Sequence, residues 1–189
     1  MNLRNWQQHF IDEFPSIIKQ HRRFIVKAPT GAGKTVLASE IVERFFKGKK
    51  IIVLCHRLVL LEQLEKAFGE KHTVRKLAVS DTGPAFEDYD ILLSTSMRAK
   101  EVLADAIPQA DLIIVDEAHR VSPNGTGYKR IIDDFKEHGK ATALFIGLTA
   151  SPERRTADQR DQLNLAFDAI IDCANIEDLI EEGVLVQPV

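Results

Sequence analysis

The segment Ala28-Pro29-Thr30-Gly31-Ala32-Gly33-Lys34-Thr35 constrains the fold of this chain more than any other part of the sequence. A β-rich run at residues 24–28 leads into it, and apolar residues at helical spacing follow it at Val36, Leu37, Ile41, Val42 and Phe45. A glycine-rich loop between a strand and a helix lets backbone N–H groups curl around phosphate oxygens beside the helix dipole. The pattern is that of a P-loop with alanine in the first glycine position. The alternative is a glycine-rich turn that only caps a helix.

The residue types in this loop predict a nucleotide triphosphate and Mg²⁺ as its ligands. Lys34 has the reach for the β- and γ-phosphates, and the Thr35 hydroxyl is suited to Mg²⁺. We expect the nucleotide to be bound by Thr30, Gly31, Ala32, Gly33, Lys34 and Thr35.

The remaining apolar runs predict an α/β fold. Strand-like runs lie at residues 51–55, 74–79, 90–93, 112–115 and 143–148. Helical patterns lie at residues 6–17, 58–68, 131–139 and 176–182, with Asn5 as the expected N-cap of the first and Pro15 expected to kink or divide it. Strands that alternate with helices predict a three-layer domain with a mainly parallel sheet and helices on both faces.

Composition limits the classes of partner and compartment. The chain has 189 residues, which favours one domain, and its 25 basic and 28 acidic residues give a net charge of −3. Any binding to nucleic acid must therefore be local. The two cysteines, Cys55 and Cys173, form no CxxC pair, so neither a zinc site nor a disulfide framework is predicted. Without a signal peptide or a run of 18 apolar residues, we expect a cytoplasmic protein that does not enter membranes.

A second chemical motif, Asp116-Glu117-Ala118-His119, follows the buried run at residues 112–115. Carboxylates that follow a parallel strand project at the edge of the sheet where the P-loop also lies. Asp116 is expected to hold Mg²⁺, and Glu117 to polarise the water that attacks the γ-phosphate. Taken alone, the two residues also fit a solvated loop. A zinc hydrolase is excluded because the sequence has no HExxH motif.

At this point the chain resembles the first RecA-like lobe of superfamily 2 helicases and translocases with a DEAH-type second motif. Residues 28–35 are similar to motif I and residues 116–119 to motif II. Residues 147–152 are similar to motif III, which implies that Thr149 and Ser151, together with His119, couple the nucleotide site to lobe motion. Residues 3–7 are similar to the element that reads adenine in this family, which implies that Arg4 and Gln7 contact the base.

Two further segments are similar to the family's nucleic-acid-binding motifs Ia and Ib. Residues 55–57 imply a phosphate contact by Arg57, and residues 93–97 imply contacts by the hydroxyls of Ser94, Thr95 and Ser96. The alternative is a solvated strand edge or a helix cap, and Ser96 is suited to such a cap. Residues 179–188 are similar to the end of the first lobe in the type III restriction-subunit and DNA-repair branches. The expected polymer is DNA rather than RNA.

The resemblance implies one RecA-like lobe over residues 1–189, because nothing after residues 149–151 supplies a second lobe with motifs IV to VI. Arg154 and Arg155 are expected to be ordinary exposed residues. The implied partner is a second RecA-like lobe, and the chain alone is expected to bind ATP and hydrolyse it slowly. The alternatives are a P-loop kinase and a non-catalytic binding or regulatory module. The pair Asp116 and Glu117 argues against the kinase.

Overall fold

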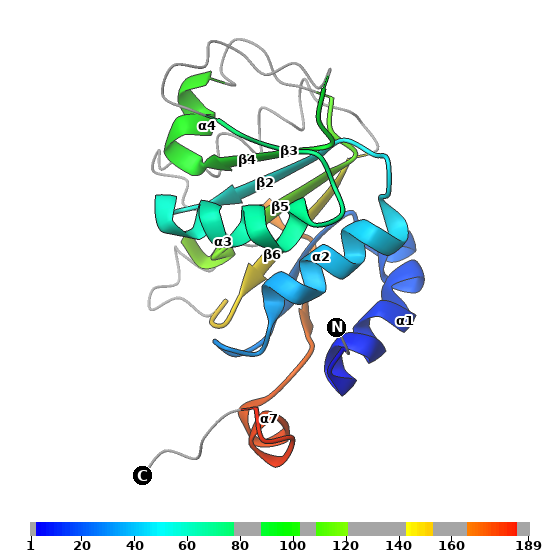
Figure 1. Cartoon of the computed structure of the whole chain (residues 1–189). Coiled ribbons are helices and arrows are strands. Elements are labelled where there is room, and N and C mark those ends of the chain that lie inside the picture. Colours follow the sequence, from blue (N-terminus) through cyan, green and yellow to red (C-terminus); the bar gives the residue numbers. More distant parts are fainter. Residues whose placement is uncertain (1–2, 78–87, 103–108, 121–142, 153–165, 185–189) are drawn as a thin grey trace.

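The computed structural model describes residues 3–77, 88–102, 109–120, 143–152 and 166–184 (Figure 1). Its strands are β1 (Arg23–Lys27), β2 (Ile51–Cys55), β3 (Val74–Lys76), β4 (Ile91–Thr95), β5 (Leu112–Asp116), β6 (Leu144–Thr149) and β7 (Ala169–Asp172). Its helices are α1 (Asn5–Gln20), α2 (Lys34–Phe45), α3 (Leu58–Gly69), α4 (Ser96–Val102) and α7 (Ile176–Glu181), with a 3₁₀ turn, η1, at Ala118–Arg120. The expected helix at 131–139, together with Arg154 and Arg155, lies outside the described residues.

The seven strands in the described ranges belong to one sheet, in the order β3-β4-β2-β5-β6-β1-β7. Each described strand pair is parallel. The carboxyl ends of the strands therefore lie at one edge. The loops after β1, β5 and β6 meet there because β6 lies between β1 and β5.

The central strands are buried on both faces and alternate between two cores. Along β2, Ile51, Val53 and Cys55 pack with the core that α1, α2 and α3 cover. Ile52 and Leu54 pack into the opposite core, to which α4 contributes Ala99. Continuous apolar runs of this kind are typical of parallel strands between two helical layers. The predicted three-layer α/β fold is confirmed.

The structure differs from the prediction in the first helix and the last strand. Helix α1 continues through Pro15, and Arg4 rather than Asn5 occupies its N-cap position. Packing of the α1 aromatic residues on the core, including Phe14 against Phe24 at 6.4 Å, accounts for a helix that continues despite the proline. Strand β7 was not predicted. It pairs only with β1 among the described strands, and alternate residues are exposed, so its apolar run is short.

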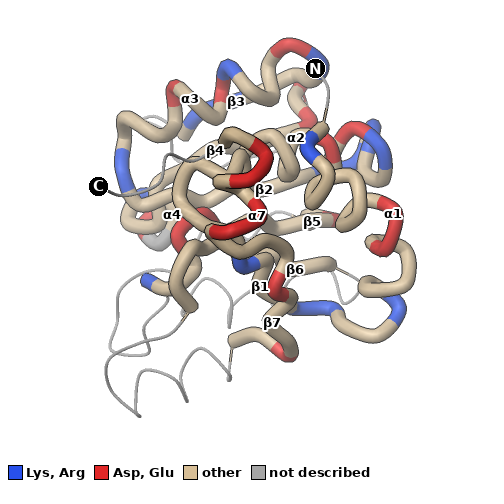
Figure 2. The backbone as a smooth tube through the Cα atoms, turned by 90° about the horizontal axis from the view of Figure 1, so that it is seen from below, with Lys and Arg blue, Asp and Glu red and all other residues tan. Residues whose placement is uncertain are grey.

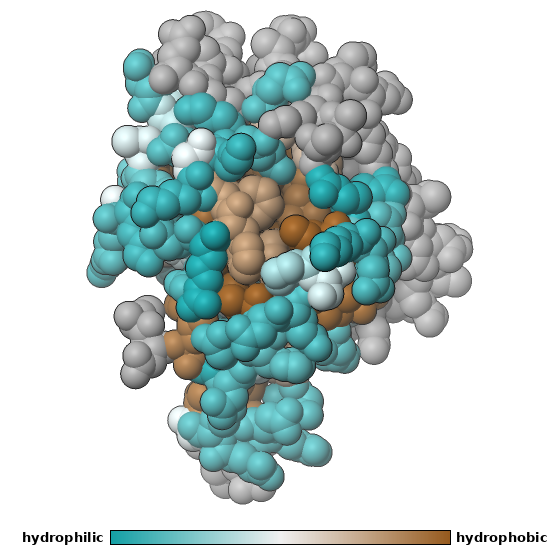
Figure 3. All heavy atoms as spheres, turned by 90° about the vertical axis from the view of Figure 1, so that its right-hand side faces the viewer, coloured by the Kyte–Doolittle hydropathy of each residue, from teal (hydrophilic) through white to brown (hydrophobic). Residues whose placement is uncertain are grey.

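The side of the molecule that carries α1 shows apolar surface between hydrophilic borders (Figure 3). A recess of about 270 Å³ is lined by Ile18, Arg22, Phe45, Phe46, Lys49, Asp111 and Leu144. Because Asp111 and Leu144 lie at the amino ends of β5 and β6, this recess is at the edge opposite the P-loop. None of the helices in the described ranges has the length and apolar character needed to cross a bilayer.

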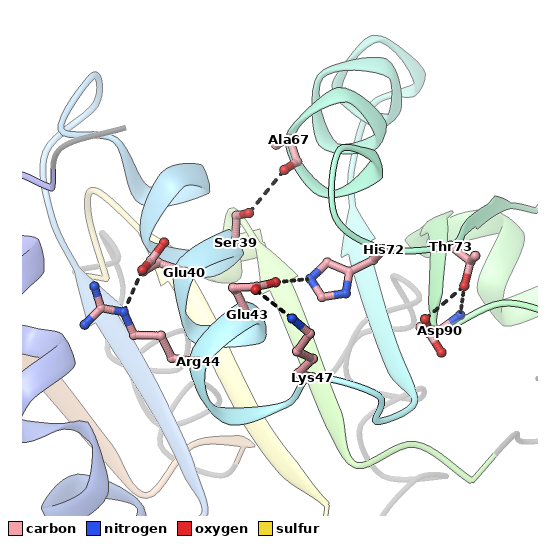
Figure 4. Close-up of polar contacts among 9 residues, drawn as sticks. All are labelled: Ser39, Glu40, Glu43, Arg44, Lys47, Ala67, His72, Thr73 and Asp90. Carbon is pink, nitrogen blue, oxygen red and sulfur yellow. Dashed lines mark hydrogen bonds and ion pairs between the residues drawn. The ribbon is translucent and has the colours of Figure 1, made fainter.

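Helices α2 and α3 are joined by polar contacts that Figure 4 shows in detail. The Ser39 hydroxyl donates to the Ala67 carbonyl at 3.1 Å. Further along α2, Glu43 Oε2 lies 3.4 Å from His72 Nε2, and the His72 side chain is only 3% exposed. Burial is the main cause that lowers the pKa of His72, and the Lys71 and Lys47 charges act in the same direction. Glu43 and Asp90 oppose this shift.

Acidification is expected to destabilise the fold in part through His72. Its pKa in the folded state lies below the ordinary value of 6.5, so the unfolded chain binds the proton more readily. The contribution of His72 to the free energy of unfolding is therefore fully present above pH 6.5 and is lost as the pH falls through its folded pKa. Urea unfolding at pH values of about 7.5 and 5.5 should show a smaller loss for His72→Gln than for the wild type.

The matched control is His9→Gln, because the His9 side chain is 74% exposed. This variant should keep the pH dependence of the wild type. An equal loss in the wild type and His72→Gln would contradict the prediction.

Candidate nucleotide site

The P-loop follows β1 and turns sharply into α2. Gly31 and Gly33 have φ values of 80° and 94°, in the left-handed region that residues with a Cβ rarely adopt. The Ala28 N–H donates to the Thr149 carbonyl at 3.1 Å, which fixes the start of the loop to the end of β6. Helix α2 begins at Lys34, directly after Gly33, so its free N–H groups face the loop.

Residues from α1 hold the P-loop from the side. The Gln7 side chain is 1% exposed, and its Nε2 donates to the Gly33 carbonyl at 2.9 Å. Its Oε1 accepts from the Arg4 N–H at 2.9 Å, and Arg4 Nη1 donates to the Gly31 carbonyl at 2.9 Å. A Cβ at Gly33 would lie 2.8 Å from Gln7 Nε2. The structure thus brings Arg4 and Gln7 to the nucleotide loop, with both side chains bonded to its backbone.

The Lys34 ammonium lies inside the loop. It donates to the carbonyls of Ala28 at 2.9 Å and Pro29 at 3.0 Å. Burial lowers the pKa of Lys34, while the charges of Glu117 and Asp116 act in the opposite direction. The ammonium is therefore near both carboxylates of the second motif, and a cation held in this loop is suited to phosphate oxygens.

Asp116 and Glu117 lie at the end of β5, as the sequence predicts. Burial is the main cause that raises the pKa of Asp116, the Glu117 charge adds to it, and the Lys34 charge opposes it. Glu117 has a φ of 55°, and among the described residues it is the one non-glycine residue with a positive φ. Such backbone is strained for a residue with a side chain and often marks functional sites.

His119 joins the second motif to the end of β6. Its Nδ1 lies 3.0 Å from Glu117 Oε2 and 2.9 Å from Thr149 Oγ1. The buried Thr149 hydroxyl also accepts from the Ser151 N–H at 3.2 Å. The structure therefore brings the three expected coupling residues into one network with Glu117.

Gly147 in β6 makes room for this network. A Cβ at this position would lie 2.7 Å from the Ala118 Cβ and 2.9 Å from Phe167 Cζ.

Gly147→Ala is therefore expected to lower the free energy of unfolding by about 1–3 kcal/mol, measured by urea unfolding. The matched control is Gly69→Ala, because nothing lies within 4 Å of a Cβ there. If both variants kept wild-type stability, close packing at Gly147 would be disproved.

The expected nucleic-acid residues lie on neighbouring strands, since Cys55 of β2 is paired with Thr95 of β4. Arg57 is exposed at the N-cap position of α3. Ser94 is fully buried and donates to the Thr95 carbonyl at 3.0 Å, and Ser96 is 8% exposed. Thr95 Oγ1 accepts from the Arg98 N–H at 3.3 Å, so Thr95 rather than Ser96 caps α4. Arg57 is the most accessible of the expected contacts.

A hollow of about 650 Å³ lies beside the P-loop, and sequence reasoning missed half of its wall. It is lined by Lys27, Pro29, Thr30, Ala150, Ser151, Asp172, Ala174, Asn175, Ile176 and Glu177. The Lys27 ammonium is 2.7 Å from Asp172 Oδ2, which joins β1 to β7 on this wall. Because β7 was not predicted, no sequence signal placed residues 172–177 beside the loop.

The donors at this edge fit Mg²⁺. Thr35 and Asp116 offer a hydroxyl and a carboxylate oxygen, and Mg²⁺ bound with a nucleotide takes few protein ligands. Within the described part of the chain, no group of three or more His, Cys, Asp or Glu side chains is arranged to hold a metal alone. The donor set therefore suits an ion shared with phosphate oxygens.

Comparisons with known proteins agree with this geometry. Residues 1–154 match the family described as "Type III restriction enzyme, res subunit". The chain is 31% identical over 195 residues to the putative ATP-dependent helicase IRC3 of Saccharomyces cerevisiae, covering 95% of this chain and 27% of that protein. The chain thus spans about a quarter of this relative's length.

Two solved structures show the same fold. The UvsW helicase of bacteriophage T4 gives a TM-score of 0.70 at 16% identity, covering 91% of this chain and 60% of that one. The SWI2/SNF2 ATPase core of Sulfolobus solfataricus in complex with dsDNA gives 0.69 at 19% identity, covering 89% and 36%. The chain belongs to the family described as "Type III restriction enzyme, res subunit".

Proposed function

We propose that this chain is the nucleotide-hydrolysing lobe of a DNA-dependent translocase and that it works with a second RecA-like lobe. The observation that carries the proposal is the meeting of Lys34, Asp116 and Glu117 at one sheet edge, where both carboxylates act on the pKa of the ammonium. ATP hydrolysis requires a positive charge that binds phosphates, an oxygen ligand that holds Mg²⁺ and a carboxylate that orients water.

In this proposal each group at the site has a separate role in binding the phosphates, the metal ion or the water. The backbone N–H groups of the P-loop and the Lys34 ammonium hold the β- and γ-phosphates. Glu117 orients water for in-line attack, and Thr35 and Asp116 hold the metal ion. Bound Mg²⁺ neutralises charge on the phosphate oxygens. His119 holds the Glu117 carboxylate beside Thr149, so the orientation of the water depends on the position of residues 149–151.

Arg4 and Gln7 are the proposed adenine contacts. Their side chains already bind the carbonyls of Gly31 and Gly33, so a base that takes over these donors would alter the support of the loop. An amide that carries both a donor and an acceptor is suited to the edge of adenine.

DNA is the proposed polymer, and Arg57 and Thr95 are its proposed contacts, because the side chains of Ser94 and Ser96 are buried. The solved SWI2/SNF2 relative is in complex with dsDNA, which supports DNA over RNA. Figure 2 shows short patches of Lys and Arg and of Asp and Glu scattered along the described chain, with acidic residues on α7. Binding is therefore expected to depend on local contacts at Arg57 rather than on a large basic face.

The second lobe is proposed because the relatives are longer than this chain. Residues 1–189 form the first lobe in this proposal, and the second lobe supplies motifs IV to VI, in the same protein or in a partner.

The cytoplasm is the proposed compartment. Burial raises the pKa of Cys55 to about 11 and of Cys173 to about 12, which leaves both as unreactive thiols there.

The test is ATP hydrolysis by the purified chain with single-stranded and double-stranded DNA and RNA, with Glu117→Gln as the blank. Stimulation by DNA above the level with RNA supports the proposal. Equal rates with all polymers, at saturating concentrations that bind the chain, would contradict DNA dependence. Turnover equal to that of a complete helicase would contradict the need for a second lobe.

A further inference from the structure

Glu117 follows β5, and the two strands beside β5 place different residues next to it. Strand β5, which ends at Asp116, lies between β2 and β6 in the sheet. On the β6 side, His119 joins the Glu117 carboxylate to Thr149. On the β2 side, Leu54 is paired with Val115, so His56 leaves the sheet at the same level as Glu117.

His56 carries a buried polar atom that the proposed mechanism does not use. Its ring is partly exposed, but its Nδ1 is buried and has no hydrogen-bond partner among the described residues. Burial lowers the pKa of His56, and the charges of Arg120 and Arg57 act in the same direction. Glu117 opposes the shift, so this imidazole lies within the electrostatic reach of the carboxylate. A buried ring nitrogen without a hydrogen-bond partner is stabilised when a small movement supplies a partner.

His56 also shares a short turn with Arg57. Cys55 Sγ donates to the Arg57 carbonyl at 3.2 Å, and the Leu60 N–H donates to the same carbonyl at 3.1 Å. These bonds fix the backbone of the turn between β2 and α3. The backbone of Arg57 is thus bonded to both ends of the turn that also carries His56, so a change in the turn at Arg57 alters the surroundings of His56 as well.

We propose that His56 is a positioning residue that transmits nucleic-acid contact at Arg57 to the carboxylate of Glu117. When a phosphate draws Arg57 outward, the turn moves the imidazole relative to Glu117. The carboxylate, held in left-handed backbone, then changes its orientation toward water. His119 performs the corresponding role for residues 149–151, so Glu117 receives one input from each neighbouring strand. This inference rests on the proposed function, because it needs both ligands.

The experiment measures coupling between the two ligands in the 189-residue chain. The dissociation constant of MgATPγS is determined with and without a saturating DNA oligonucleotide, for the wild type, His56→Gln and Arg57→Ala. His9→Gln is the matched control because its side chain is 74% exposed on α1. In parallel, the His56 imidazole resonances are followed by NMR, with His56→Gln for their assignment.

The proposal expects the oligonucleotide to change the nucleotide dissociation constant of the wild type by about fivefold or more. In His56→Gln this ratio should fall to within about twofold of one, while each ligand alone binds within about threefold of the wild-type value. The oligonucleotide should shift the His56 resonances in the wild type but not in Arg57→Ala. A merely structural role would instead change the unfolding free energy and leave the ratio intact.

Three results would overturn the inference. The first is a wild-type ratio retained in His56→Gln. The second is a wild-type protein that binds both ligands but whose nucleotide dissociation constant is the same with and without the oligonucleotide. That result would contradict the role of His56 and leave the proposed ATP and DNA binding intact. The third is a loss of nucleotide binding in folded His56→Gln, which would make His56 a binding residue. If the wild type binds no oligonucleotide, the proposed nucleic-acid function itself fails.

Discussion

Replacing Glu117 with glutamine is expected to lower the rate of ATP hydrolysis by about 10²–10⁴-fold. In the proposed mechanism the carboxylate takes a proton from the attacking water, and the amide cannot accept it. Because the two side chains have nearly the same shape, the backbone at φ 55° and the contact with His119 are expected to persist. The dissociation constant for MgATP should stay close to the wild-type value, so the variant holds ATP without turning it over.

The measurement is single-turnover hydrolysis of ATP beside equilibrium binding of the same nucleotide. Analysis of the products separates hydrolysis, which yields free phosphate, from a kinase, which yields a phosphorylated small molecule. Asp172→Asn is a useful control, since this carboxylate lines the neighbouring hollow and has no role in the proposed chemistry. Wild-type turnover by Glu117→Gln would show that another group activates the water.

Replacing Lys34 with alanine is expected to lower turnover by about 10²–10³-fold and, unlike the change at Glu117, to weaken nucleotide binding as well. The ammonium is held by the carbonyls of Ala28 and Pro29, in the loop where the phosphates are proposed to lie. Its removal leaves the negative phosphate oxygens without the ammonium whose pKa the charges of Asp116 and Glu117 raise. Calorimetry with MgATP measures the loss of affinity, and phosphate release measures the loss of turnover.

The control for this variant is Lys49→Ala, because Lys49 is exposed at the opposite edge of the sheet. It should bind and hydrolyse ATP as the wild type does. A non-catalytic binding module predicts that Lys34→Ala keeps its function in the cell. Unchanged affinity and turnover in Lys34→Ala would contradict the nucleotide site as described.

The parts of the fold that the sequence predicts are those whose signal is local. Strands β2 and β5 are uninterrupted apolar runs because both faces are covered, and the glycines of the P-loop mark positive φ values. Strand β7 was not predicted because its four residues are only partly buried and form a strand through their pairing with β1.

The details of the site depend on tertiary contacts in the same way. The bond from Gln7 Nε2 to the Gly33 carbonyl, 26 positions away, and the burial of Ser94 arise from segments far apart in the chain. The residue types at 4, 7 and 94 are visible in the sequence, but their partners are not. Short-range patterns therefore identified the motifs and could not assign every hydrogen bond among them.

The parallel sheet also determines when during folding such a site can exist. The Ala28 N–H at the start of the P-loop donates to the Thr149 carbonyl, so the loop is fixed only when β6 has paired with β1. Contacts so distant in sequence close late and slowly. A nascent chain therefore gains no stabilisation from ATP until almost all of the lobe has emerged, whereas after folding ATP raises the stability of the whole cooperative unit by mass action.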